Sequence, residues 1–160
     1  MEYDVYVDGS YKEFGAVKLY AGATLIVEKG GSEPLAALTK VGSDSYIDMR
    51  NVAGEIMATL MAFEHCLNVL HLTQADTVNL YYDYKGIENW CLPQSNPNHW
   101  RARNDLTQGY RDYVNTRVRT SFKVNFCHIK GHSGNPGNTC VDALAKRAIE
   151  LHMNDLMRNT

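Results

Sequence analysis

The sequence has no excess of charge of either sign. Its 160 residues contain 16 lysines and arginines against 18 aspartates and glutamates, which leaves a formal charge of -2 at pH 7. Proteins that coat nucleic acids or acidic membranes through their overall charge are strongly basic, so that class is excluded. Any site for a polyanion must therefore be local.

Long apolar runs are also missing. No stretch approaches the roughly 20 apolar residues that a membrane-spanning helix requires. Met1 is followed by the acidic residues Glu2 and Asp4 instead of the basic start of a signal peptide. The sequence therefore predicts a soluble, cytoplasmic protein that has no membrane partner.

Cysteines are few and widely spaced, and they form neither a CxxC pair nor a close cluster with histidines. Structural zinc sites need short spacings between ligands, and secreted disulfide scaffolds need a higher density of cysteines. We therefore interpret all four as small core or surface residues in a reducing compartment, not as metal ligands. They are Cys66, Cys91, Cys127 and Cys140.

Neither a repeat of fixed period nor a linker rich in proline and glycine divides the chain, so we expect a single domain over residues 1–160. Apolar residues that alternate with polar ones predict strands, and apolar spacings of three and four predict helices. Strands are expected at 2–8, 19–28, 35–41, 77–82 and 121–129, and helices at 54–72, 85–91, 100–116 and about 139–156. The order βββαβααβα predicts an α/β fold.

Two of the expected strands run into aspartates, Asp8 and Asp83. If these strands are neighbours, the two carboxylates lie at one rim of the sheet and repel each other unless a cation lies between them. Glu55 and Asp142 are expected in the first turns of two helices, where the helix dipole favours negative charge. Four acids could then converge on Mg²⁺ or Mn²⁺, and a pair of such ions is suited to in-line phosphoryl displacement.

Each acid also has a purely structural explanation. Asp8 can be a turn former, because the first strand is expected to stop there. Glu55 can serve the helix dipole, and Asp142 can complete a capping box. Asp83 is harder to explain in this way, since it follows the apolar run 80–82, and such a strand end usually continues into the core.

A glycine-rich stretch over residues 131–138 contains His132. An imidazole in such a loop can carry a proton near neutral pH. A surface histidine in a loop often has no role at all, and this alternative stays open.

Four segments, taken in order, resemble the type 1 ribonuclease H family. They are Val5–Ser10, Arg50–Glu55, Tyr81–Asp83 and the stretch from Ile129 through Lys-Gly-His-Ser-Gly to Asp142. Each motif is weak alone, but the ordered set covers almost the whole chain. The resemblance implies a mixed five-stranded sheet flanked by helices. It also implies hydrolysis of the RNA strand of an RNA/DNA hybrid, which leaves 5′-phosphate and 3′-hydroxyl ends.

By the same resemblance, two Mg²⁺ ions, which Mn²⁺ could replace, bind at the acids. Asp8 would bridge both ions, Glu55 and Asp83 would complete one, and Asp142 would help to hold the other. The ions would align and activate a water, stabilise charge on the scissile phosphate and assist the leaving group. His132 corresponds to a loop histidine that aids turnover, so its loss should matter less than the loss of a carboxylate. We expect a monomer.

Substrate contacts are implied as well. Gly9, Ser10 and Asn51 correspond to family positions that contact ribose 2′-hydroxyls, which distinguish RNA from DNA. Trp90 corresponds to an aromatic residue that packs against a sugar of the DNA strand. The alternative for Trp90 is a plain core tryptophan.

The sequence departs from the family pattern in the elements that grip the hybrid. Residues 91–99, where many relatives carry a basic protruding handle, contain no lysine or arginine. No amino-terminal hybrid-binding module is expected, because the first strand begins almost at Met1. Compensating charge could come from basic residues further along, which could equally form a solvated surface. They are Arg101, Arg103, Arg111, Arg117, Arg119, Lys123 and Lys130.

Two other functions remain open, since integrases, transposases and junction resolvases share this fold. A DNA-processing nuclease would cut all-DNA substrates and lose nothing when Asn51 is replaced. A catalytically silent nucleic-acid-binding module would tolerate Asp83→Asn. Four gathered carboxylates argue against the silent module, because they cost stability when no metal is bound.

Overall fold

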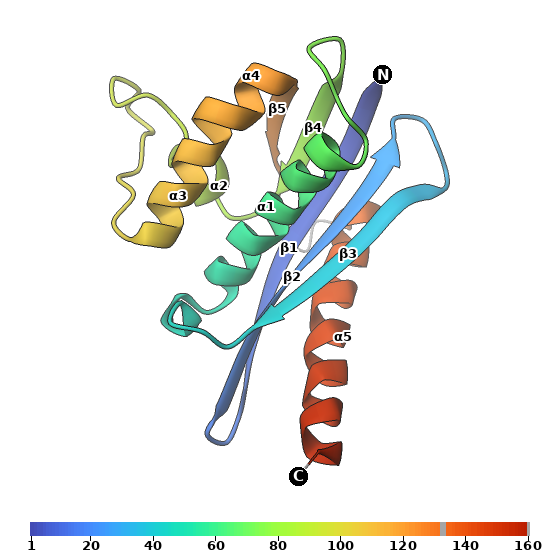
Figure 1. Ribbon diagram of the computed structural model, residues 1–160, viewed down its shortest axis with the longest axis vertical. Helices are drawn as coiled ribbons and strands as arrows, with labels where there is room; N and C mark the ends of the chain where they lie inside the picture. The colour runs from blue at the N-terminus through green and yellow to red at the C-terminus, as the bar shows by residue number, and fades with distance from the viewer. Residues whose placement is uncertain (132–133, 160) are drawn as a thin grey trace.

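A five-stranded mixed sheet forms the centre of the computed structural model, which describes residues 1–131 and 134–159 (Figure 1). The strands are β1 (Glu2–Phe14), β2 (Val17–Glu28), β3 (Pro34–Gly42), β4 (Thr77–Tyr82) and β5 (Lys123–His128), in the spatial order β3-β2-β1-β4-β5. β1 pairs antiparallel with β2 and parallel with β4, and β4 pairs parallel with β5. The expected α/β fold with a mixed five-stranded sheet is confirmed.

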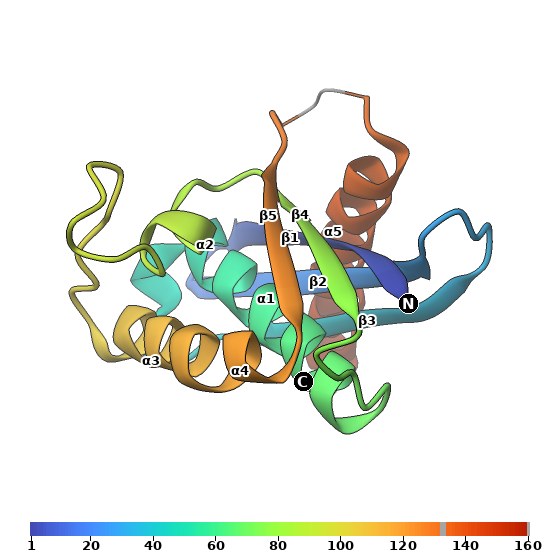
Figure 2. The same ribbon diagram turned by 90° about the horizontal axis from the view of Figure 1, so that it is seen from above.

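Helices cover both faces of the sheet (Figure 2). On one face lie α1 (Asn51–Asn68), α2 (Gly86–Asn89), α3 (Asp105–Tyr113) and α4 (Arg119–Ser121), and on the other lies α5 (Pro136–Arg158). A 3₁₀ turn, η1 (Ile47–Met49), precedes α1, and a π-helical turn, η2 (Val114–Val118), joins α3 to α4. None of the helices within the described ranges is long and apolar enough to span a membrane.

Alternation along the central strands builds the core. Val5 and Val7 of β1 and Leu80 of β4 belong to the main cluster of buried residues on the α1 face, whereas Tyr6 packs with residues of α5. β2 is buried on both faces over residues 19–26, because α1 and α5 sandwich it. This explains its nearly continuous apolar run.

Three glycines let α1 lie very close to the sheet. A Cβ atom at Gly9, Gly22 or Gly54 would come well within 3.0 Å of backbone atoms of the facing element. Backbone atoms cannot move aside as flexible side chains do, so these positions need glycine for reasons of space. The close packing brings the start of α1 against the middle of β1.

The structure corrects several expected boundaries. β1 does not end at Asp8 but continues to Phe14, because Gly9 accommodates α1 and does not form a turn. The helix expected at 54–72 runs from Asn51 to Asn68. The helix expected from residue 100 begins at Asp105, since Asn104 forms a capping box with Thr107, and the helical run continues to Ser121. The remaining strand limits shift by at most two residues.

The last helix also begins earlier than expected, at Pro136 instead of about residue 139. Its N-cap is Asn135, whose side chain accepts a hydrogen bond from the Asn138 N–H at 3.1 Å. The expectation that Glu55 and Asp142 lie in first helical turns is therefore wrong, and so is the capping box that ends at Asp142. Helix dipoles do not account for these two acids, because the effect is confined to the first turn.

Candidate active site

A gap opens in the sheet where β1 and β4 separate. The last pair in their parallel register is Tyr6 and Tyr81, after which β1 continues beside β2 alone. The chain leaves β4 at Asp83, where the His128 ring donates a hydrogen bond to the Asp83 carbonyl oxygen at 2.8 Å. Asp8 lies on the opposite side of this gap. The carboxyl end of a parallel strand pair is the place where α/β sheets commonly bind ligands.

Three carboxylates meet in the gap. Asp8, Glu55 and Asp83 each place a carboxylate oxygen within 4.8 Å of the other two. Asp8 is 6% exposed and Glu55 is 1% exposed, so two of the three acids are buried. No other group of acidic, histidine or cysteine side chains in residues 1–131 and 134–159 gathers this closely.

The backbone N–H of Gly9 ties two of these carboxylates together. It donates to Glu55 Oε2 at 2.8 Å and to Asp8 Oδ1 at 2.9 Å. Glu55 reaches this N–H because Gly9 has no side chain to keep α1 away from the strand. The same glycine therefore sets the helix position and the carboxylate position.

Burial and mutual repulsion raise the pKa values of two of the acids. Burial, followed by the negative charge of Asp83, raises the pKa of Asp8 to about 7. Burial, followed by the charges of Asp83 and Asp8, raises the pKa of Glu55 well above its usual range. Carboxyl groups placed in this way favour their neutral form unless a cation compensates their charges.

The oxygens of the site also need an electropositive partner. Among the described residues, the buried side-chain oxygens without a hydrogen-bond partner are Glu55 Oε1 and Asn138 Oδ1. Both belong to this site, because Glu55 is in the cluster and Asn138 lines the cavity beside it. An unsatisfied buried oxygen costs about 1–3 kcal/mol. A hard divalent cation such as Mg²⁺ or Mn²⁺ prefers these oxygen ligands, so the residues fit a metal site.

A cavity of about 490 Å³ opens at the cluster, and we call it the acidic cavity. It brings together most of the residues that the sequence singled out, and Glu55 joins them through the carboxylate cluster. His132 lies outside the described residues. Those that line the cavity are Asp8, Gly9, Ser10, Asn51, Asp83 and Asp142.

Asp142 shares the cavity but not the three-acid cluster. It lies half-buried on α5, and its Oδ2 accepts an ion-pair contact from Lys146 Nζ at 3.0 Å. Its negative charge is one of the weaker causes of the raised pKa of Asp8. The fourth acid thus faces the other three from the opposite layer of the fold.

Several cavity residues were not anticipated from the sequence. Asn138 and Lys146 lie four positions before and after Asp142, which places all three on one face of α5. That spacing could have identified them if the start of the helix had been known. Arg50 opens the segment Arg50–Glu55 that resembles the family, but it was not predicted as a site residue, because its place at the cavity depends on a backbone turn. The unanticipated residues are Tyr11, Arg50, Asn138, Thr139 and Lys146.

The backbone of Arg50 is strained. Its φ of 56° and ψ of −130° lie in a region that residues with a Cβ atom avoid, at a cost of about 1–3 kcal/mol. The residue joins η1 to α1, and its guanidinium lies 5.8 Å from the centre of the Tyr11 ring. The preceding residue, Met49, lines a different cavity.

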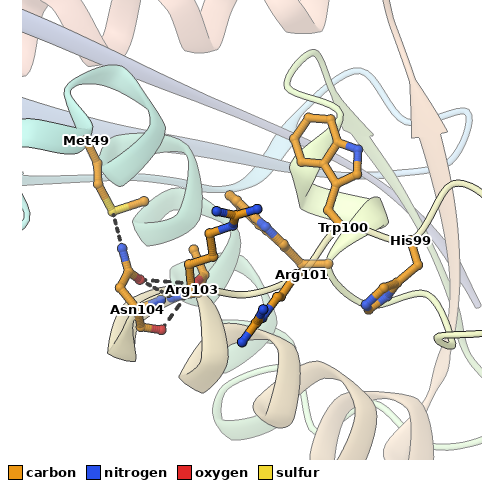
Figure 3. Close-up of a pocket in the computed structure, with 8 residues that line it drawn as sticks. Met49, His99, Trp100, Arg101, Arg103 and Asn104 are labelled. Carbon is orange, nitrogen blue, oxygen red and sulfur yellow. Dashed lines mark hydrogen bonds between the residues drawn. The ribbon is translucent and has the colours of Figure 1, made fainter.

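This second cavity, of about 480 Å³, lies beside η1 and the start of α3, and we call it the aromatic cavity (Figure 3). Two arginines that the sequence proposed as compensating charge, Arg101 and Arg103, line it. Asn104 closes one side by donating from Nδ2 to Met49 Sδ at 3.2 Å. The aromatic cavity thus combines positive charge with aromatic rings.

Trp90 lies at the aromatic cavity but is largely buried. It is 7% exposed, because its ring packs against Tyr84, Trp100 and Tyr110. Trp100 is 37% exposed and offers the more accessible ring. Sequence reasoning missed Trp100, since its exposure depends on the irregular chain before α3.

The raised pKa of Asp8 predicts that the metal-free protein loses stability as the pH rises. Protonated Asp8 contributes fully to the free energy of unfolding below the usual pKa of 3.8. This contribution is lost as the pH rises through about 7, the pKa of Asp8 in the folded protein. Asp8→Asn removes the charge and can still accept the Gly9 N–H. In EDTA at pH 8 we expect Asp8→Asn to raise the free energy of unfolding by about 2 kcal/mol.

Chemical unfolding of both proteins over a pH series measures this effect. The advantage of the variant should narrow as the pH falls toward 3.8. An advantage that stays constant with pH would contradict the proposed origin in Asp8 ionisation.

The chain is similar to known ribonucleases H in sequence and in fold. A sequence profile of the RNase H family matches residues 1–150. A ribonuclease H of Ralstonia nicotianae is 29% identical over 161 residues, which span 94% of this chain and 93% of that protein. A ribonuclease H of Dichelobacter nodosus is 38% identical over 76 residues, which span 43% of this chain and only 47% of that relative. RNase H1 of Halobacterium salinarum has the same fold, with a TM-score of 0.69 and 17% identity over 94% of this chain and 98% of that one.

Proposed function

The chain belongs to the ribonuclease H family, and on that premise we propose that it hydrolyses the RNA strand of RNA/DNA hybrids in a metal-dependent reaction. The observation that carries the proposal is the meeting of three carboxylates, two of them buried, in the gap between β1 and β4. A module that only binds nucleic acid gains nothing from buried carboxylates that repel each other and its ligand. Metal-dependent phosphodiester hydrolysis requires such a group.

The metal ligands in this proposal are Asp8, Glu55 and Asp83 for one ion, and Asp8 with Asp142 for a second. The all-oxygen donor set favours Mg²⁺, with Mn²⁺ as a substitute. When bound, the ions supply activation of the attacking water and stabilisation of charge at the scissile phosphate. The proposed products carry 5′-phosphate and 3′-hydroxyl ends.

The chain itself holds its ligands and the RNA strand in position. The Gly9 N–H keeps Glu55 and Asp8 in their places. Ser10 and Asn51 line the acidic cavity, where hydroxyl and carboxamide groups can exchange hydrogen bonds with ribose 2′-hydroxyls. This contact underlies the proposed selectivity for RNA. We assign His132 an auxiliary role in moving protons or releasing product.

The aromatic cavity is the proposed binding site of the DNA strand. The two cavities adjoin the junction between Met49, which lines the aromatic cavity, and Arg50, which lines the acidic cavity. A duplex lying across this junction would place one strand in each. Arg101 and Arg103 offer charge to phosphates, and the exposed Trp100, backed by Trp90, offers a ring to a sugar or base. A basic handle is then unnecessary.

A cleavage assay tests the proposal. Purified protein in Mg²⁺ receives an end-labelled RNA/DNA hybrid beside duplex RNA, duplex DNA and single-stranded RNA. We expect cleavage only of the RNA strand of the hybrid, and none in EDTA or by Asp83→Asn. Cleavage of all-DNA substrates that Asn51→Ala leaves unchanged would indicate a DNA-processing nuclease instead. Binding without cleavage in Mg²⁺ or Mn²⁺ would indicate a silent module.

A further inference from the structure

We propose that Arg50 anchors the substrate by binding a phosphate of the cleaved strand beside the carboxylate cluster. The inference rests on the proposed function, because it concerns the strand that occupies the acidic cavity. It can nevertheless be tested by binding alone. Three features of the molecule support it, namely the charges of the cavity, the support of the guanidinium and the backbone strain.

The acidic cavity needs a free cation to receive a polyanion. Asp8, Asp83 and Asp142 line it, and its basic lining residues are Arg50 and Lys146. Lys146 is already paired with Asp142 at 3.0 Å. Within the described part of the chain, Arg50 has no carboxylate at ion-pair distance. Its charge is therefore available to a ligand.

Tyr11 supports the guanidinium of Arg50. The guanidinium carbon lies 5.8 Å from the centre of the Tyr11 ring, a separation at which a cation is attracted to the ring face. The ring is itself held, because the Tyr11 hydroxyl donates to Glu13 Oε1 at 2.7 Å. A guanidinium held over a ring keeps N–H groups at its edge for a second partner, and their fork matches two oxygens of a phosphate.

The strain at Arg50 argues against a chance placement of a surface arginine. Glycine could adopt φ 56° and ψ −130° without strain, yet this position carries a long charged side chain. The other described residue with a positive φ and a side chain is His71, with φ 52°. His71 follows the end of α1, where a left-handed residue is common. The strain at Arg50 lies instead at the mouth of the acidic cavity.

The salt dependence of binding tests the contact directly. An Asp83→Asn background prevents cleavage, and fluorescence anisotropy gives the Kd of a labelled RNA/DNA hybrid from about 50 to 200 mM KCl. Arg50→Gln should weaken binding about 5–10-fold and reduce the slope of log K against log salt by about 0.9, the share of one phosphate. Arg50→Lys should restore the slope. Lys40→Gln, the same loss of charge on β3 outside both cavities, should leave it unchanged.

A pair of glycine substitutions separates anchoring from folding. Arg50→Gly should relieve the strain and raise Tm by about 2–4 °C, while it weakens hybrid binding as Arg50→Gln does. His71→Gly should raise Tm without affecting binding. Equal salt slopes for Arg50→Gln and the parent, or unchanged binding by Arg50→Gly, would overturn the proposal.

The outcomes also distinguish this inference from the proposed function. If the wild type cuts hybrids but the Arg50→Gln slope equals that of the parent, only the phosphate contact fails. If the wild type cuts no hybrid in Mg²⁺ or Mn²⁺ and the slope still falls, the contact stands and the proposed hydrolysis fails.

Discussion

Replacing Asp8 by asparagine is expected to lower the rate of hybrid cleavage in Mg²⁺ about a thousandfold or more. Asp8 lies within 4.8 Å of both Glu55 and Asp83 and borders the acidic cavity, and in the proposed arrangement its carboxylate would help to hold both ions. Asparagine has nearly the same shape but supplies no charge, and it should keep the hydrogen bond from Gly9. Single-turnover cleavage of an end-labelled hybrid measures the effect on chemistry.

The same variant carries its own control against unfolding. Because Asp8→Asn removes a buried charge, the metal-free variant should be more stable than the wild type at pH 8 while it is almost inactive. Asp4→Asn is the matched substitution on the same face of β1. Asp4 accepts a hydrogen bond from Asn79 and does not line the acidic cavity. Its activity should stay within about twofold of the wild type. Near-normal cleavage by Asp8→Asn would refute the proposed metal ligation.

Gly54→Ala is expected to lower the free energy of unfolding by about 3 kcal/mol or more. Alanine is the better helix former, so helix propensity alone predicts a gain. The added Cβ would meet the carbonyl group of Ala21 well within 3.0 Å, and α1 would have to move away from β2. Urea unfolding monitored by circular dichroism measures the loss.

Gly109→Ala provides the opposite result from the same substitution. Gly109 is exposed in α3, and a Cβ there would have no atom within 4 Å. This variant should gain about 0.5–1 kcal/mol, because only the helix propensity changes. Similar effects of the two substitutions would contradict the view that Gly54 is needed for close contact between α1 and β2. Glu55 follows Gly54 directly, so any folded Gly54→Ala protein should also cleave hybrids more slowly.

The order of the elements and the acidic residues were visible in the sequence because they depend on local patterns. Alternation identified the strands, and two aspartates at apolar strand ends indicated a shared rim. Apolar periodicity and the following residues suggested the wrong starting points for two helices, which begin after the caps Asn104 and Asn135. These errors changed the explanation of Asp142 without moving it out of the cavity.

Features that depend on distant contacts could not be predicted from local patterns. Gly9 in the sequence suggests a turn, whereas in the structure it stays in the strand and meets residues 51–55 of α1. The burial of Trp90 depends on Trp100 and Tyr110, which lie beyond an irregular loop. The orientation of Arg50 depends on a backbone conformation that only a glycine would have indicated in the sequence.

The sheet also divides the site between two buried clusters, one on each of its faces. Asp8, Glu55 and Asp83 are attached to β1, α1 and β4, whose side chains form the main buried cluster. Segments of this kind exchange their amide hydrogens only when the whole protein unfolds, whereas peripheral segments open by themselves. Asp142 and Lys146 belong to α5, where their neighbours Val141 and Ala145 are buried in a smaller cluster with residues of β2. The three clustered acids therefore depend on the main buried cluster, whereas the fourth depends on a separate, smaller cluster on the other face of the sheet.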